Sequence, residues 1–148
     1  MTLNLNQEEI RVLHLPPGHT DGDSVVFFKH ANVVHMGDHF FAGRFPFVDL
    51  GSGGDVGGYI ANVRAMLEQI TPEMKIIPGH GPLSTKRDLE TFRDTLVQTV
   101  SIIQKKIEAG KSLAEIQAEG LDAKWKSWGG GFISTKRWIE TVFKSLTR

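Results

Sequence analysis

The stretch PPGHTDGDSVVFFKHANVVHMGDHFF, residues 16–41, decides how this chain folds. Its two short apolar runs, SVVFF and NVVHM, have the composition of neighbouring β-strands. Histidine and aspartate side chains, which can hold a metal ion, flank these runs. Because strands fix geometry and loops give access, functional side chains often lie at such junctions. A later segment, PGHGP at residues 78–82, repeats the arrangement after another short apolar run.

The surrounding sequence predicts strands in the first half of the chain and helices in the second. The predicted strands cover residues 10–15, 24–29, 32–36 and 74–77, with a hairpin turn at His30-Ala31. The apolar continuity of the hairpin strands predicts burial on both of their faces. Apolar residues at helical spacing predict helices over 56–69, from Ser84 or Thr85 to Gly110, over 113–118 and over 135–146. A glycine-rich, aromatic loop is expected over 37–58.

Length and composition exclude several classes of protein. A chain of 148 residues is expected to form one domain, 1–148. The 17 basic and 17 acidic residues are not gathered into blocks, which argues against nucleic acid as a partner. No apolar run approaches the roughly 18 residues of a membrane span, and the N-terminus does not resemble a signal peptide. We therefore expect a soluble chain, cytoplasmic as given.

Three residues at strand ends are the candidate metal ligands: His19, Asp38 and His80. Each follows an apolar run and lies beside a glycine, which lets the backbone turn sharply and leaves the side chain exposed to a shared site. Because the chain has no cysteine, any metal must be held by histidine and carboxylate groups. These donors suit zinc, iron or manganese, and a carboxylate can bridge two ions.

The segments GHTDGDS at 18–24, MGD at 36–38 and IPGHG at 77–81 resemble, in order and spacing, the third, fourth and fifth motifs of the metallo-β-lactamase superfamily. The resemblance implies an α/β (α+β) fold related to an αββα sandwich with a dinuclear metal site. It also implies that His19 binds a first zinc ion, that His80 binds a second, and that Asp38 bridges them. In the family, a metal-bound hydroxide hydrolyses a small-molecule substrate, so these three residues would be catalytic through the metal.

The first metal motif of that superfamily, His-x-His-x-Asp-His, does not occur in these 148 residues. The chain therefore resembles the C-terminal half of the fold, one mixed sheet with helices on one face. Each metal would keep only two ligands, so we expect weak occupancy and little activity from this chain alone, unless His19, Asp38 and His80 converge on a single ion as an open site. The region of Val25, Phe27, Val33 and Met36 is expected to form an exposed apolar face. That face predicts a homodimer, a higher homo-oligomer or a missing N-terminal half as partner.

Other residues carry weaker expectations. A non-catalytic, self-associating half-domain that at most binds metal is the alternative to a hydrolase. His39 is the best additional ligand candidate, although a strand neighbour of Asp38 is expected to point to the opposite face. His35 is expected to be a satisfied core or supporting residue, His14 a core or edge residue, and His30 a solvent-facing turn residue. The phenylalanines of the long loop would line a pocket or pack in the core: Phe40, Phe41, Phe45 and Phe47.

Overall fold

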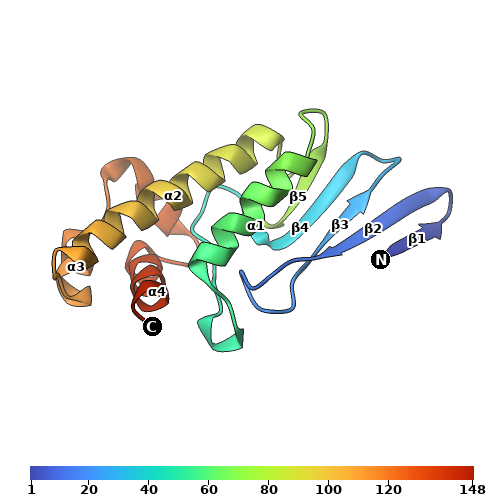
Figure 1. Ribbon diagram of the computed structural model, residues 1–148. Helices are drawn as coiled ribbons and strands as arrows, with labels where there is room; N and C mark the ends of the chain where they lie inside the picture. Colours follow the sequence, from blue (N-terminus) through green and yellow to red (C-terminus); the bar gives the residue numbers. More distant parts are fainter.

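The computed structural model describes residues 1–148 and contains one five-stranded mixed sheet with helices packed on one side (Figure 1). The spatial order of the strands follows the chain, and the first four pair antiparallel. The last strand pairs parallel to its neighbour, which confirms a mixed sheet. The strands are β1 (Thr2–Leu5), β2 (Glu8–His14), β3 (Ser24–Phe28), β4 (Val33–Phe41) and β5 (Lys75–His80).

Four α-helices begin where the sequence predicts them to begin. They are α1 (Val56–Gln69), α2 (Lys86–Glu108), α3 (Leu113–Glu119) and α4 (Thr135–Thr147), with 3-10 segments at Leu50–Ser52 and Ala123–Gly130. Each start has a polar cap whose side chain accepts a backbone N–H of the first turn: Asp55, Thr85, Ser112 and Ser134. None of these helices has both the length and the apolar character that a membrane crossing requires.

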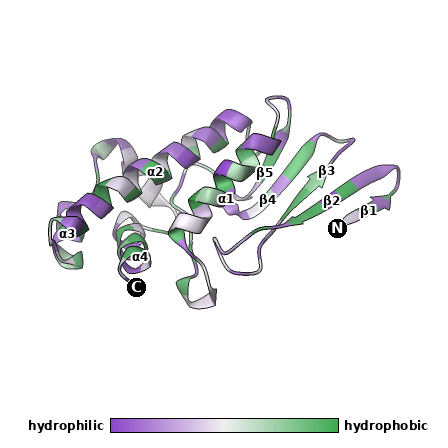
Figure 2. Ribbon diagram, viewed as in Figure 1, coloured by the Kyte–Doolittle hydropathy of each residue, from purple (hydrophilic) through white to green (hydrophobic).

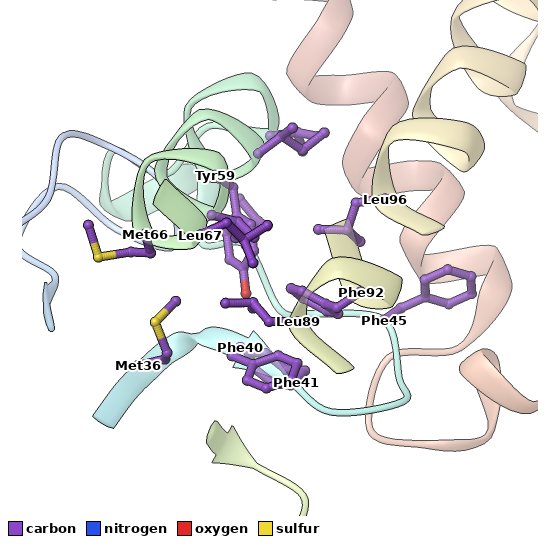
Figure 3. Packing of buried hydrophobic residues seen from close by; sticks show 14 of the residues in the cluster. Met36, Phe40, Phe41, Phe45, Tyr59, Met66, Leu67, Leu89, Phe92 and Leu96 are labelled. Atoms are coloured by element: carbon purple, nitrogen blue, oxygen red, sulfur yellow. The ribbon is translucent and has the colours of Figure 1, made fainter. Parts of the chain in front are cut away.

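The sheet face beneath the helices forms the core of the molecule. Val25, Phe27, Val34 and Met36 are all 3% exposed or less. They belong to one buried cluster with residues of α1, α2 and α4. Figure 3 shows Met36 and Phe40 of β4 below Tyr59 and Met66 of α1, with Leu89 and Phe92 of α2 beside them. The helices therefore cover the face on which Val25, Phe27 and Met36 lie, and the expectation that these three are exposed is wrong.

The opposite sheet face carries apolar residues without a covering layer. The strand register places Ile10 opposite Phe28 and Val12 opposite Val26, and Val26 and Phe28 in turn face His35 and Val33. These side chains are partly exposed, and we call them the open face: Ile10, Val12, Val26, Phe28, Val33 and His35. Figure 2 shows hydrophobic residues along β2, β3 and β4. An open apolar face exists, but of the four residues predicted to form it only Val33 lies there, and the expected burial on both faces is also wrong.

The strands differ from the sequence-based expectation mainly at β1, which was not predicted, and at the ends of β4 and β5, which continue to Phe41 and His80. The four residues of β1 are exposed and therefore look like a polar lead in the sequence. They form a strand because they pair with β2. β4 continues past Met36 to Phe41, whereas the glycine at 37 favoured an ending there. Gly37 takes a φ of 53°, and the β4–β5 register shifts on both sides of it. Such a bulge redirects the strand without ending it, so Asp38 lies within β4.

Candidate metal centre

The three predicted ligand residues meet at one edge of the sheet. His19 lies in the loop between β2 and β3, Asp38 lies in β4 just after the bulge, and His80 is the last residue of β5. The loop of His19 is fixed by backbone hydrogen bonds, in which the amide of Asp49 donates to the carbonyl of His19 and that of Asp55 donates to the carbonyl of Gly18. The long loop after β4 thus holds the histidine loop against the sheet edge.

The Asp38 carboxylate lies between the two histidines. Its Oδ2 atom is 3.5 Å from Nε2 of His19, and its Oδ1 atom is 3.3 Å from Nε2 of His80. Two ligands about 2.1 Å from one zinc ion at a tetrahedral angle lie about 3.4 Å apart. Each histidine–aspartate pair therefore has the spacing of two ligands on one ion, and the shared carboxylate has the placement of a bridge.

The other ring nitrogen of His19 fixes which nitrogen faces Asp38. Nδ1 of His19 lies 3.0 Å from Oδ1 of Asp23. Burial raises the pKa of the Asp23 carboxyl, but hydrogen bonds from Thr20 and His19 lower it by a larger amount. The pKa of Asp23 therefore lies below its ordinary value. An ionised carboxylate can only accept hydrogen bonds, so Nδ1 of His19 donates to Asp23 and the ring presents Nε2 to Asp38. A metal-binding histidine is commonly oriented in this way.

Close packing around Asp38 explains one of the glycines in the motifs. A Cβ atom on Gly79 would collide with Oδ1 of Asp38 and the carbonyl of Gly37. Only glycine therefore lets β5 approach closely enough to bring His80 to the carboxylate. From the core side, the buried hydroxyl of Tyr59 donates to the backbone carbonyl of Asp38 at 2.8 Å. Burial raises the pKa of Tyr59 well above its ordinary value, so this donor stays protonated.

Sequence reasoning missed Asp23, whose Oδ1 lies 3.0 Å from Nδ1 of His19. The signal was available in HTDGD, where a carboxylate follows His19 by four residues. His39 points away from the histidine–aspartate pairs, as strand alternation predicts, and only 1% of it is exposed. It stacks on Tyr59 with ring centroids 4.9 Å apart, and its Nε2 lies 3.0 Å from Nδ2 of Asn62. Burial lowers the pKa of His39 to about 4.

The remaining histidines lie away from the centre. The side chain of His30 is 68% exposed at the β3–β4 turn, as predicted. His14 is exposed at the end of β2, where its ring contacts the carbonyl of Asp23. His35 lies on the open face and is not a core residue, although its Nδ1 is satisfied by the amide of Gly37.

Aromatic rings flank both candidate ligands. Phe47 packs edge-on against His19 with ring centroids 5.9 Å apart, and Phe41 stacks on His80 at 4.4 Å. Phe40, Phe41 and Phe45 are buried, so only Phe47 of the loop phenylalanines could border a substrate pocket. A polar cavity of about 660 Å³ lies on the α4 side of Phe47, and its lining includes Arg137. This cavity is not lined by His19, Asp38 or His80, so we do not assign the chemistry to it.

The donors present fit zinc or iron in type and spacing but not in number. No group of three or more histidine, cysteine, aspartate and glutamate side chains in this structure could hold a metal ion. The three side chains consequently do not converge on a single ion and form two pairs that share Asp38. Catalytic zinc usually has three protein ligands, so each pair lacks at least one.

Residues 3–84 match the family model of the metallo-β-lactamase superfamily. No curated protein matches the sequence. The matched region contains all three candidate ligands and ends before α2. The helices from α2 to α4 therefore lie outside the matched segment.

Solved structures share the fold. The sec-alkylsulfatase Pisa1 from Pseudomonas sp. is 14% identical with a TM-score of 0.77, and the match covers 99% of this chain and 25% of that one. The B3 metallo-β-lactamase BLEG-1 is 25% identical with a TM-score of 0.55, covering 64% of this chain and 44% of the lactamase. A metallo-β-lactamase from Pontibacter korlensis is 16% identical with a TM-score of 0.54, covering 65% and 45%. The chain thus spans less than half the length of each of these structures.

Proposed function

Because this chain belongs to the metallo-β-lactamase superfamily, we propose that it is the C-terminal half of a zinc-dependent hydrolase. The proposal rests mainly on one observation: the Asp38 carboxylate lies at ligand–ligand distance from Nε2 of both His19 and His80. Both histidines point the same ring nitrogen at the two oxygens of one carboxylate, which is the placement expected of two ligands whose ions share a bridge.

The residues of this chain have distinct roles in the proposed centre. His19 and His80 would each bind one ion through Nε2, and Asp38 would bridge the two ions. Bound zinc supplies a Lewis acid and lowers the pKa of a coordinated water to roughly 7, which makes a nucleophile available near neutral pH. Tyr59 holds the backbone of Asp38 from the core side, and Phe47 and Phe41 restrict how the histidine rings can turn.

The missing ligands and the open face point to the same partner. Each ion has two ligands from this chain, and an uncovered apolar sheet face lies behind the strands that carry them. A second sheet packed on that face would bury it and could bring the additional ligands to the same edge. We propose that this sheet comes from an N-terminal half, or from a second copy of the chain where no such half is present.

The test is a hydrolysis assay on two zinc-loaded proteins. One is this chain alone, and the other is the chain joined to a segment that carries a His-x-His-x-Asp-His motif. The panel contains a β-lactam, a thioester, a lactone and a phosphate ester. It also contains a secondary alkyl sulfate, because the Pisa1 match extends over 99% of this chain. We expect activity from the joined protein that Asp38→Ala abolishes. If the joined protein folds, binds zinc and hydrolyses nothing, the non-catalytic alternative is correct.

A further inference from the structure

Asp23 is the meeting point of a buried polar network behind His19. Its Oδ1 accepts hydrogen bonds from Nδ1 of His19 at 3.0 Å and from Oγ1 of Thr20 at 2.9 Å. Its Oδ2 accepts the backbone N–H of Thr20 at 2.7 Å. The side chain is only 13% exposed, so water does not compete strongly for these positions. Every partner is a donor, so the site requires a group with two accepting oxygens.

A second histidine faces the same carboxylate from the core. Nδ2 of Asn62 donates to the carbonyl of Pro16 at 2.7 Å, which fixes the orientation of the amide. The same Nδ2 lies 3.0 Å from Nε2 of His39, so that ring nitrogen must be the acceptor. A ring nitrogen that accepts a hydrogen bond carries no proton, so the proton of the His39 ring sits on Nδ1. This nitrogen is buried without a hydrogen-bond partner and lies 3.7 Å from Oδ2 of Asp23.

A buried N–H group without an acceptor destabilises the folded state, so the acceptor nearest to Nδ1 of His39 indicates what this group is placed to bind. Oδ1 of Asp23 faces Nδ1 of His19 and Oδ2 faces Nδ1 of His39, so the two histidines approach different oxygens of one carboxylate. A shift of well under 1 Å would close the bond and leave the carboxylate held from two sides by two N–H groups. The alternation of β4 places His39 behind the centre and Asp38 in it, so one strand serves both sides of the network.

We propose that Asp23 is the positioning residue for His19 and that His39 and Asn62 keep its carboxylate in place. In this arrangement Asp23 holds a proton on Nδ1 of His19 and fixes the ring so that Nε2 points toward Asp38 before any metal binds. Preorganisation of this kind removes the need to reorient the ring on metal binding. The proposal depends on the proposed function only for the identity of the ion that Nε2 would bind.

The direct test is the tautomer of His19 in the metal-free protein, measured by long-range ¹H–¹⁵N correlation of the histidine rings. We expect the proton of His19 on Nδ1 in the wild-type chain. In Asp23→Asn, the new NH₂ group must face at least one of the donors now bound to Asp23. We therefore expect His19 to change to the Nε2–H tautomer or to a mixture. Asp21→Asn is the matched control, because Asp21 is an exposed carboxylate in the same loop.

Zinc titration of the same proteins is the second measurement. Loss of such a supporting carboxylate typically weakens metal binding by about 10- to 100-fold, and we expect that change for Asp23→Asn and none for Asp21→Asn. The proposal is overturned if wild-type His19 carries its proton on Nε2, a result that does not require the variant to fold. It is also overturned if Asp23→Asn leaves both tautomer and zinc affinity unchanged. A chain with the expected tautomer that binds no zinc would contradict the proposed function alone.

Discussion

The two faces of the sheet are built from similar residues but have different surroundings. Phe27 and Phe28 are neighbours on β3, yet Phe27 is 3% exposed beneath the helices and Phe28 is partly exposed on the open face. The same holds for Val25 and Val26. Apolar character therefore does not tell which face is covered. The residues of the covered face are buried beneath helices, whereas the equally apolar residues of the open face have no second layer packed on them.

The proposed metal centre is incomplete in the same way. Its donors lie at the edge of the sheet, supported from the covered side by Tyr59 and the Asp23 network. No third histidine, cysteine, aspartate or glutamate side chain completes either pair. We therefore expect substitutions on the covered face to lower the stability of the isolated chain, and substitutions on the open face to act mainly on its association with a partner.

The largest expected effect is on the covered face. Phe27→Ala should lower the free energy of unfolding by about 3–5 kcal/mol, because it leaves a cavity in a packed core. Phe28→Ala should cost no more than about 1 kcal/mol in the monomer, since its ring is partly in water. Urea unfolding at low protein concentration measures both. Equal losses would show that the open face is already as well packed as the covered one.

Acid should destabilise the covered side through His39. Its pKa is lowered from 6.5 to about 4 by burial, so the unfolded chain binds the proton at a higher pH than the folded chain. Stability from this residue is complete above pH 6.5 and falls as the pH approaches 4. Between about pH 7.5 and 4.5 the loss should be about 2.5 kcal/mol.

The contribution of His39 is isolated by comparing unfolding free energies at both pH values with those of His39→Gln. The variant should lose less stability on acidification than the wild type by about that amount. His30→Gln, at an exposed position, controls for the loss of a histidine side chain. A pH dependence of His39→Gln identical to that of the wild type would contradict the buried, neutral state of the ring.

The open face should govern self-association. We expect the wild-type chain to associate at tens of micromolar, and Val26→Lys to weaken the association at least about tenfold because a charge would be buried in the contact. Ala61→Lys adds the same charge at an exposed position of α1 and should have no effect. Light scattering across a concentration series measures this. A wild-type chain that stays monomeric throughout would contradict association through the open face.

The smallest expected effect connects the covered face to Asp38. Tyr59→Phe removes the hydrogen bond to the Asp38 carbonyl and should cost about 1 kcal/mol of unfolding free energy. The loss should be small because the ring remains packed against Phe92 and His39. Thermal unfolding followed by circular dichroism measures it. A loss as large as that of Phe27→Ala would indicate a collapse of the core around β4.

Local sequence signals predicted the helices, most strands and the three residues at the sheet edge. Capping residues such as Asp55 and Ser134 act within one turn, so they are readable without tertiary information. Which face the helices cover was not readable, because Phe27 and Phe28 are identical in type. Asp23 was missed because its role depends on a loop that folds back on itself, and the end of β4 was missed because a glycine bulge resembles a break.

Zinc analysis of the purified chain, compared with Asp38→Ala, tests the central claim most directly. We predict that the wild-type chain binds zinc weakly, because each ion has two ligands from this chain, and that Asp38→Ala loses this binding, because both pairs share that carboxylate. Equilibrium dialysis against a zinc series gives both values. An unchanged zinc content in Asp38→Ala would contradict the assignment of the metal centre to this edge of the sheet.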